Sequence, residues 1–157
     1  MVATQVLFVC MGNICRSPTA QAVFQHCVEQ AGEGANIGVD SAGTIGAHIG
    51  NTPDSRATKA ALARGYDLSP LRARQVNSSD FERFDYILAM DEQNLSHLRW
   101  MQPQDFGGHL GLFLEFHPQA PVTEVPDPYY GDGDGFNEVL DLVEEASQGL
   151  LRALGET

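Results

Sequence analysis

Positive charge is scarce in this chain. Its 157 residues include nine lysines and arginines against 21 aspartates and glutamates, which gives a net charge of -12 at pH 7. A nucleic-acid backbone or an anionic membrane surface attracts proteins of the opposite sign, so the composition excludes both as partners. Charged residues make up 19% of the chain and hydrophobic ones 43%, which excludes a disordered or fibrous protein.

Long hydrophobic runs are also missing. The run Val6–Val9 is too short for the core of a signal peptide, has no basic residue before it and is soon followed by Arg16, and no other stretch is long enough to span a bilayer. We therefore expect a cytoplasmic protein without membrane insertion. The three cysteines, an odd number, fit free thiols in a reducing compartment better than a disulfide framework.

Metal-ligand spacings are absent too. Neither the five histidines nor the three cysteines are arranged as in a metal site, so we expect no metal and no other cofactor. No repeat or linker divides the sequence, and its length is close to that of one domain of roughly 150 residues. We expect a single domain over residues 1–157.

Strand-like and helix-like segments alternate along the chain. Val6–Val9 has the continuous apolar pattern of a strand buried on both faces, and an apolar stripe with helical spacing follows Ser17, the expected N-cap, and Pro18. Further strands are expected at 37–41, 84–90 and 109–114, and further helices at 54–64, 92–98 and 135–155. The alternation predicts an α/β fold with a mainly parallel sheet, whose ligand site lies at the carboxyl ends of the strands.

The segment between the first strand and the first helix has the features of an anion-binding loop. It reads Cys10-Met11-Gly12-Asn13-Ile14-Cys15-Arg16-Ser17. The backbone N–H groups at the start of a helix favour an anion, and Arg16 adds a planar fork that matches two phosphate oxygens. Cys10 faces the same positive surroundings, so we expect it to be a thiolate at neutral pH.

Other residues of this loop fit the same role. Gly12 permits close approach or a positive φ, Asn13 tolerates the left-handed region, and Ser17 can donate a hydrogen bond to the sulfur. The alternative, in which Cys10 is a small core residue that ends a strand, leaves these neighbours unexplained.

Six segments spread over nearly the whole chain form a larger pattern. They are Val9–Pro18, Asp40–Thr44, Pro53–Asp54, Ala73–Gln75, Asp85–Asp91 and Val125–Gly131. In order and spacing they resemble the low-molecular-weight protein tyrosine phosphatase family. The resemblance implies a four-stranded parallel sheet flanked by helices on both faces, with the phosphate-binding loop after the first strand. It also implies hydrolysis of phosphotyrosine-containing proteins through a phosphocysteine intermediate, with inorganic phosphate as product.

The phenolate that leaves in such a reaction needs a proton, and Asp127 is the candidate acid. Pro126 and Pro128 stiffen the backbone on either side of it. The tripeptide alone also fits an ordinary turn, and the resemblance favours the acid. Asp132 and Asp134 are expected to be solvated turn residues.

The remaining site residues fall into three groups. Phosphate binding is expected from Met11, Gly12, Asn13, Ile14, Cys15 and Ser17. A substrate pocket that selects phosphotyrosine over the shorter phosphoserine is expected from Ile14, Ala47, Tyr129 and Tyr130, although both tyrosines also fit surface or core positions. Supporting roles are expected from Ser41, which resembles the family residue bonded to the loop asparagine, and from Asp91 as the partner of Arg16.

Two positions depart from the family pattern. Leu71 replaces a histidine that many members link to the loop asparagine, so the hydrogen-bond network is expected to be shorter here. Ala47 replaces an aromatic residue, so one wall of the substrate cleft is expected to be open.

Other functions with the same loop are less well supported. An arsenate reductase of this fold needs further thiols, and no cysteine follows Cys27. A protein-arginine phosphatase is expected to carry threonine at the position of Ile14. A non-catalytic phosphate-binding module has no need of both Cys10 and Asp127. Cys15 is either a redox partner that captures an oxidised Cys10 as a disulfide or a packing residue beneath the helix.

Overall fold

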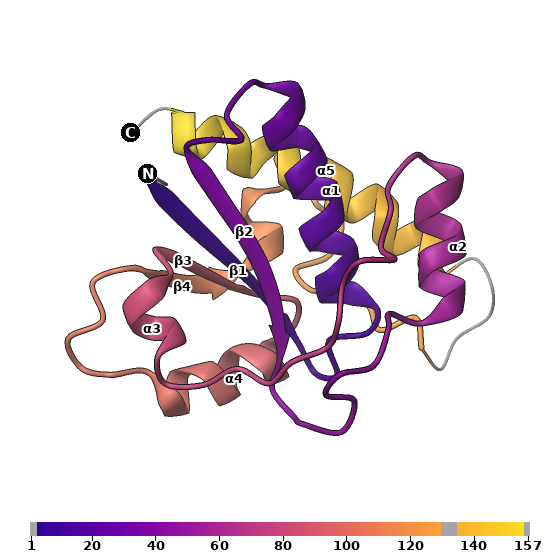
Figure 1. Ribbon diagram of the computed structural model, residues 1–157. Coiled ribbons are helices and arrows are strands. Elements are labelled where there is room, and N and C mark those ends of the chain that lie inside the picture. The colour runs from indigo at the N-terminus through magenta and orange to yellow at the C-terminus, as the bar shows by residue number, and fades with distance from the viewer. Residues whose placement is uncertain (1–2, 130–134, 156–157) are drawn as a thin grey trace.

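Four parallel strands form one sheet in the order β2-β1-β3-β4 (Figure 1). The computed structural model describes residues 3–129 and 135–155. The strands are β1 (Thr4–Cys10), β2 (Ile37–Gly43), β3 (Tyr86–Ala89) and β4 (His109–Leu112), and all three pairings are parallel. The predicted α/β fold and its four-stranded parallel sheet are confirmed.

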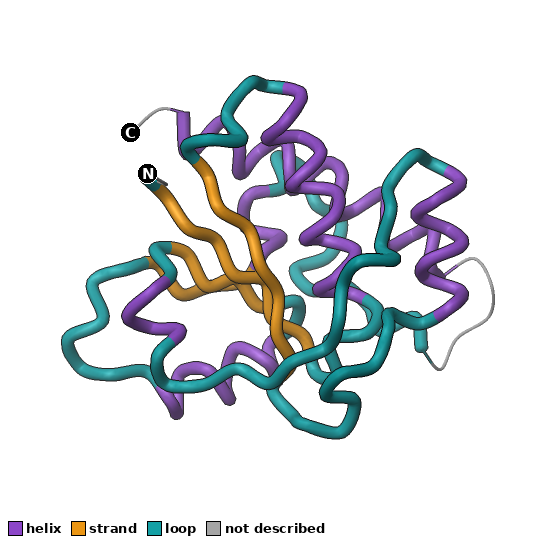
Figure 2. The backbone as a smooth tube through the Cα atoms, in the orientation of Figure 1, coloured by secondary structure: helices purple, strands orange, loops and turns teal. Residues whose placement is uncertain are grey.

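Helices cover both faces of the sheet, as the family resemblance implies (Figure 2). One face carries α1 (Arg16–Gln30), α2 (Ser55–Ala63) and α5 (Gly135–Gly155), and the other carries α3 (Asp80–Arg83) and α4 (Glu92–Met101). A 3-10 turn, η1 (Phe113–Phe116), follows β4 directly. The short elements α3 and η1 escape prediction because four residues are too few to show a period.

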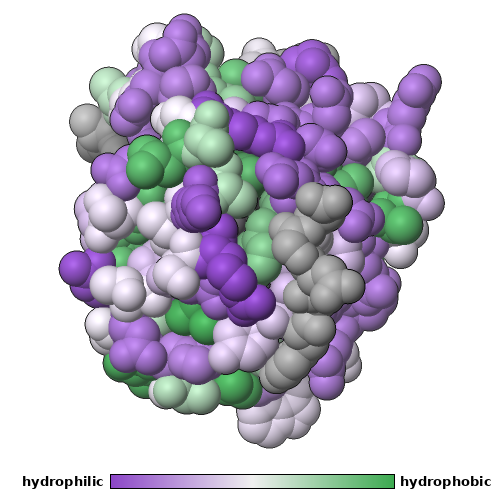
Figure 3. All heavy atoms as spheres, turned by 90° about the vertical axis from the view of Figure 1, so that its right-hand side faces the viewer, coloured by the Kyte–Doolittle hydropathy of each residue, from purple (hydrophilic) through white to green (hydrophobic). Residues whose placement is uncertain are grey.

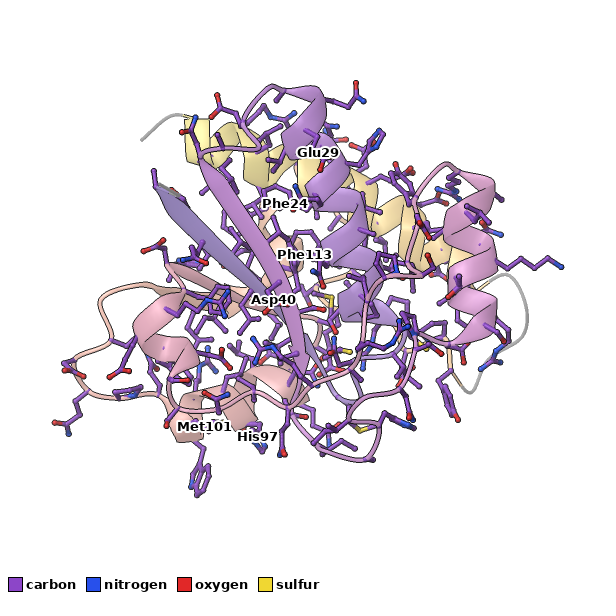
Figure 4. All side chains as sticks on the ribbon, in the orientation of Figure 1. Phe24, Glu29, Asp40, His97, Met101 and Phe113 are labelled. Carbon is purple, nitrogen blue, oxygen red and sulfur yellow. The ribbon has the colours of Figure 1, made fainter. Side chains whose placement is uncertain are left out.

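The central strand β1 is buried on both faces, which explains why its sequence is apolar without alternation. All four residues from Val6 to Val9 are fully buried: Val6 and Phe8 pack with α1 and α5, whereas Leu7 and Val9 pack with α3 and α4. Phe8 meets Phe24 and Phe113 edge to face, with ring centroids 5.8 and 4.8 Å away (Figure 4). These contacts hold the first strand, and the loop that follows it, against the first helix.

The start of α1 differs from the prediction. Cys15 rather than Ser17 is the N-cap residue, and it makes no side-chain cap hydrogen bond. Ser17 lies inside the first turn because its hydroxyl is used by the loop, where it contacts Cys10 and Asn13. Pro18 is still in the first turn, where a missing N–H costs nothing.

The phosphate loop packs against the end of β2. A Cβ at Gly43 would lie 2.7 Å from the Met11 carbonyl oxygen, so only glycine allows this contact. Thr44 N–H donates to the Cys10 carbonyl at 2.9 Å, and Val125 N–H donates to the Met90 carbonyl at 2.8 Å. The carboxyl ends of β1, β2 and β3 thus bring the loops that follow them together at one edge of the sheet.

The face of the molecule on the side of α2 is mostly polar. Seen from the side of α2, hydrophilic residues dominate and hydrophobic ones form small separate areas (Figure 3). Within residues 3–129 and 135–155, every helix is too short or too polar to cross a membrane.

Candidate active site

The loop from Cys10 to Arg16 curls around the cysteine sulfur. Asn13 N–H points at Cys10 Sγ from 3.3 Å, and Asn13 has a φ of 58°, a left-handed conformation that no other non-glycine residue of the described chain adopts. Gly12 does not take a positive φ; a Cβ there would lie 3.0 Å from the His48 ring, so glycine serves close approach instead. The Asn13 N–H, the start of α1 and the Arg16 guanidinium lie together in this loop, an arrangement that favours an anion.

The buried Asn13 side chain holds this loop in shape. Its Nδ2 donates to Ser17 Oγ at 2.7 Å and to Ser41 Oγ at 3.0 Å, and its Oδ1 accepts from Arg74 N–H at 3.0 Å. The hydrogen bond between Asn13 and Ser41 implied by the resemblance is therefore present. The loop is tied at one residue to α1, to β2 and to the segment after Leu71.

Gln21 adds a further hydrogen bond to the network around Asn13. Ser41 Oγ donates to Gln21 Oε1 at 2.6 Å, while the apolar Leu71 is half-buried nearby and contributes no side-chain hydrogen bond. The hydrogen-bond network around Asn13 thus extends through Ser41 to α1. Sequence reasoning missed Gln21 because its distance from Ser41 depends on how α1 packs on β2.

The direction of these hydrogen bonds determines the role of Ser17. An amide Nδ2 only donates, so Ser17 Oγ accepts from Asn13 and its own proton is free. Cys10 Sγ lies 3.0 Å from Ser17 Oγ, whereas the Ala42 carbonyl lies 3.4 Å away. The hydroxyl proton of Ser17 therefore has two acceptors within reach, and the Cys10 sulfur is the nearer of them.

Arg16 is the buried cation of the site. Its side chain is 4% exposed and forms an ion pair with Asp91, with Nη1 2.6 Å from Oδ2, and Nη1 also donates to the Val125 carbonyl at 3.1 Å. Burial opposes the charge of the guanidinium, but the facing negative charge of Cys10 and the bond to Asp91 outweigh it and raise the pKa of Arg16. The expected pairing of Arg16 with Asp91 is thus found, and Asp91 is itself held by Asn94 N–H at 2.8 Å.

Asp127 lies beside Arg16 in the wall of the pocket. Its Oδ2 lies 3.6 Å from Arg16 Nη2, and its Oδ1 accepts from Tyr129 N–H at 3.0 Å. The Asp127 side chain is 31% exposed, so it can exchange protons with water. A carboxyl group from a segment over a hundred residues after Cys10 therefore lies in the same pocket as the cysteine.

These residues line one pocket. Eight predicted site residues lie in its wall: Cys10, Met11, Gly12, Ile14, Cys15, Arg16, Asp127 and Tyr129. Ala47 is exposed and does not line the pocket; the adjacent His48 does, and its ring packs on Gly12. The cleft wall that was expected to be open at Ala47 is thus partly formed by the His48 ring, which sequence reasoning did not predict. Tyr130, Asp132 and Asp134 lie outside the described residues.

Cys15 lies beneath the same pocket. Burial, followed by the negative charges of Asp54, Cys10 and Asp127, raises the pKa of the Cys15 thiol to about 12. Cys15 is therefore a neutral thiol at pH 7. All three cysteines of the chain are free.

A metal has no evident ligand set here. Within the described part of the chain, histidine, cysteine and acidic side chains form no group of three or more that could hold an ion. The positive charge at the pocket comes from Arg16 and backbone N–H groups.

Comparison with known proteins points to one family. The family model described as low molecular weight phosphotyrosine protein phosphatase matches residues 5–157. A low molecular weight protein-tyrosine-phosphatase of Streptomyces coelicolor is 47% identical over 156 residues, which cover 97% of this chain and 94% of the relative.

Solved structures agree with the sequence relatives. A protein tyrosine phosphatase from Entamoeba histolytica, with Hepes in its active site, superposes with a TM-score of 0.94 at 41% identity over 98% of this chain and 97% of that one. A Drosophila arginine phosphatase superposes with a TM-score of 0.89 at 31% identity over 95% of this chain and 96% of that one. The fold is therefore shared by relatives named for two different phosphorylated residues.

Proposed function

Because this chain belongs to the low molecular weight phosphotyrosine protein phosphatase family, we propose that it hydrolyses phosphotyrosine with Cys10 as nucleophile, Arg16 as phosphate clamp and Asp127 as general acid and base. One observation carries the proposal. A single pocket contains a cysteine within an anion-binding loop, a buried guanidinium and a carboxyl group 3.6 Å from that guanidinium. Nucleophile, charge stabiliser and proton donor are the three functions that this chemistry needs.

The reaction has two steps. In the first, the Cys10 thiolate forms a bond to phosphorus as the bond from phosphorus to the phenolic oxygen breaks, and protonated Asp127 gives its proton to that oxygen. In the second, the Asp127 carboxylate takes a proton from water as the water oxygen bonds to phosphorus and the sulfur leaves. Inorganic phosphate departs and the thiolate is restored. Arg16 and the loop N–H groups hold the equatorial oxygens throughout.

The nucleophile is tested by Cys10→Ser. Hydrolysis of p-nitrophenyl phosphate should be lost while inorganic phosphate still binds, because the cradle and Arg16 remain. The matched control is Cys27→Ser, because Cys27 is a buried cysteine on α1 away from the pocket; this variant should keep its activity. Appreciable hydrolysis by folded Cys10→Ser enzyme would contradict the assignment.

The acid is tested by Asp127→Asn across phenyl phosphates of graded leaving-group acidity. kcat/KM should fall by roughly 10²–10⁴ for poorly acidic phenols and far less for strongly acidic ones, which leave without a proton. The control is Asp105→Asn, since Asp105 is an exposed aspartate on the loop after α4; this variant should leave kcat/KM unchanged. An equal loss at every leaving group would point to a structural role for Asp127.

Specificity for phosphotyrosine rather than phosphoarginine rests on the pocket wall. Ile14 presents an apolar side chain and Tyr129 an aromatic ring, surfaces that suit a phenyl group better than a charged guanidinium. Phosphotyrosine peptides should therefore be hydrolysed far faster than phosphoarginine peptides, and Tyr129→Ala should narrow the difference. Comparable kcat/KM for the two would favour the activity for which the Drosophila relative is named.

Redox control is the second role proposed for this loop. Hydrogen peroxide oxidises the Cys10 thiolate to a sulfenic acid, and the Cys15 thiol then forms the S–S bond as its proton and the sulfenic hydroxyl leave together as water. Inactivation should be reversed by dithiothreitol in the parent enzyme and in Cys27→Ser, but not in Cys15→Ser, whose Cys10 proceeds to sulfinic acid. Full recovery of Cys15→Ser would make Cys15 a packing residue.

Phosphotyrosine proteins of the cytoplasm are the proposed partners. Three free thiols, one of them the nucleophile, suit a reducing compartment. Cys10→Ser should retain tyrosine-phosphorylated proteins from a cytoplasmic extract, and vanadate, which competes for the anion cradle, should release them. Retention that vanadate does not affect would contradict this partner class.

A further inference from the structure

The proposed acid lies between two anchored residues of a segment that has no regular secondary structure. On its N-terminal side, Val125 N–H donates to the Met90 carbonyl at 2.8 Å, and the Val125 carbonyl accepts from Arg16 at 3.1 Å. This anchor ties the backbone two residues before Asp127 to β3 and to the phosphate clamp.

The second anchor lies two residues after the acid. Tyr129 N–H donates to Asp127 Oδ1 at 3.0 Å, and the carbonyl of Tyr129 accepts from Arg56 Nη2 at 3.1 Å. The Arg56 guanidinium carbon also lies 5.4 Å from the centre of the Tyr129 ring. One arginine thus holds both the backbone and the ring of the residue that orients the acid.

The Arg56 side chain, 47% exposed, is itself held by two further neighbours. Its Nε and Nη2 form a fork on the Asp54 carboxylate at 3.2 and 3.0 Å, and its guanidinium carbon lies 4.9 Å from the ring centre of the buried Phe136. Asp54 caps α2 and donates its own N–H to the Ile14 carbonyl at 2.8 Å. The acid segment is therefore connected to the phosphate loop through Tyr129, Arg56 and Asp54.

We propose that Arg56 is a positioning residue for proton transfer, because it anchors Tyr129, whose N–H orients the Asp127 carboxyl group toward the leaving oxygen. The inference rests on the proposed role of Asp127 as the acid. Arg56 is not among the residues that line the pocket, and its guanidinium binds Asp54 and the Tyr129 carbonyl. Its contribution is specific to leaving groups that need a proton, since displacement of about 1 Å at a reacting group can cost 10²-fold in rate.

The test is Arg56→Gln, measured as kcat/KM over the same graded phenyl phosphates. We expect a loss of roughly 10- to 100-fold for poorly acidic phenols and less than about threefold for strongly acidic ones. Arg56→Lys keeps the charge but cannot form the fork, so it should lose nearly as much. Arg64→Gln is the matched control: Arg64 also joins α2 to another element, through Asp141 and Glu144 of α5, and lies away from the pocket.

A double-mutant cycle separates positioning from general weakening. In the Asp127→Asn background, Arg56→Gln should cost less than about threefold at every leaving group, because no acid remains to be aligned. The same loss in both backgrounds, or a loss equal across all leaving groups, would overturn the role of Arg56 while leaving Asp127 as the acid. A flat leaving-group profile for Asp127→Asn alone would instead overturn the acid assignment, and this inference with it. Thermal melting of each variant shows whether it is folded at the assay temperature.

Discussion

Replacing Asn13 separates two contributions that one residue makes to the phosphate loop. Its buried side chain forms three hydrogen bonds, to Ser17, Ser41 and Arg74 N–H, and its backbone is left-handed at φ 58°. Glycine adopts that conformation freely but has no side chain to form the bonds. Alanine lacks the bonds and is also strained at a positive φ.

The magnitudes follow from these two contributions. Three hydrogen bonds at about 1 kcal/mol each predict that Asn13→Gly lowers the free energy of unfolding by about 3 kcal/mol. The left-handed conformation adds about 1–2 kcal/mol for a residue with a Cβ, so Asn13→Ala should lose about 4–5 kcal/mol. A domain with about 5–15 kcal/mol of stability can lose this much and still unfold measurably.

Urea denaturation of the three proteins, with matched m-values, measures the order of stability. The parent protein should be the most stable, Asn13→Gly the next and Asn13→Ala the least stable. Titration with inorganic phosphate should give the same order of phosphate affinity. The control Asn137→Ala, on the exposed face of α5, should stay within about 0.5 kcal/mol of the parent. If Asn13→Ala were as stable as Asn13→Gly, the role of the left-handed backbone would be refuted. A loss below about 1 kcal/mol for both would refute the role of the hydrogen bonds.

Other predictions concern groups around the site. Arg74→Met should lower the free energy of unfolding by about 3 kcal/mol in urea denaturation, because it leaves the carboxylate of Asp80, 4% exposed, without its cation; a loss under about 1 kcal/mol would show that Asp80 does not depend on the pair. Since the pKa of Cys15 is about 12, its alkylation by iodoacetamide should accelerate about tenfold per pH unit with no plateau up to about pH 10, as mass spectrometry would record, and a plateau near pH 9 would contradict the burial argument. Gly43→Ala should abolish phosphate binding in calorimetric titration because the new Cβ displaces the loop, and unchanged affinity would mean that the loop moves without cost.

Much of the fold and part of the site follow from sequence alone. Val6–Val9 predicts a strand buried on both faces because periodicity is a local property of the chain. Asp54 and Asp91 mark helix starts because a cap is satisfied within a few residues of itself. Cys10 and Arg16 share one loop for the same reason, since a strand followed at once by a helix brings both to a single anion cradle.

Other predictions needed the family pattern as well as the residues. Asp127 is separated from Cys10 by most of the chain, and its flanking prolines fit an ordinary turn equally well. Its resemblance to the family segment, rather than any local signal, predicted it as the acid. The same holds for Ser41 as the partner of Asn13.

Only the tertiary structure shows how distant side chains meet. Gln21 reaches Ser41, His48 rather than Ala47 forms part of the pocket wall, and Arg56 holds Tyr129. Each of these contacts depends on the packing of α1, α2 and the long loops at the carboxyl edge of the sheet. Hydrophobic periodicity and helix capping depend on residues that are close together in the sequence. A hydrogen bond across the site instead requires the strand order and the helix packing to place two side chains within about 3 Å of each other.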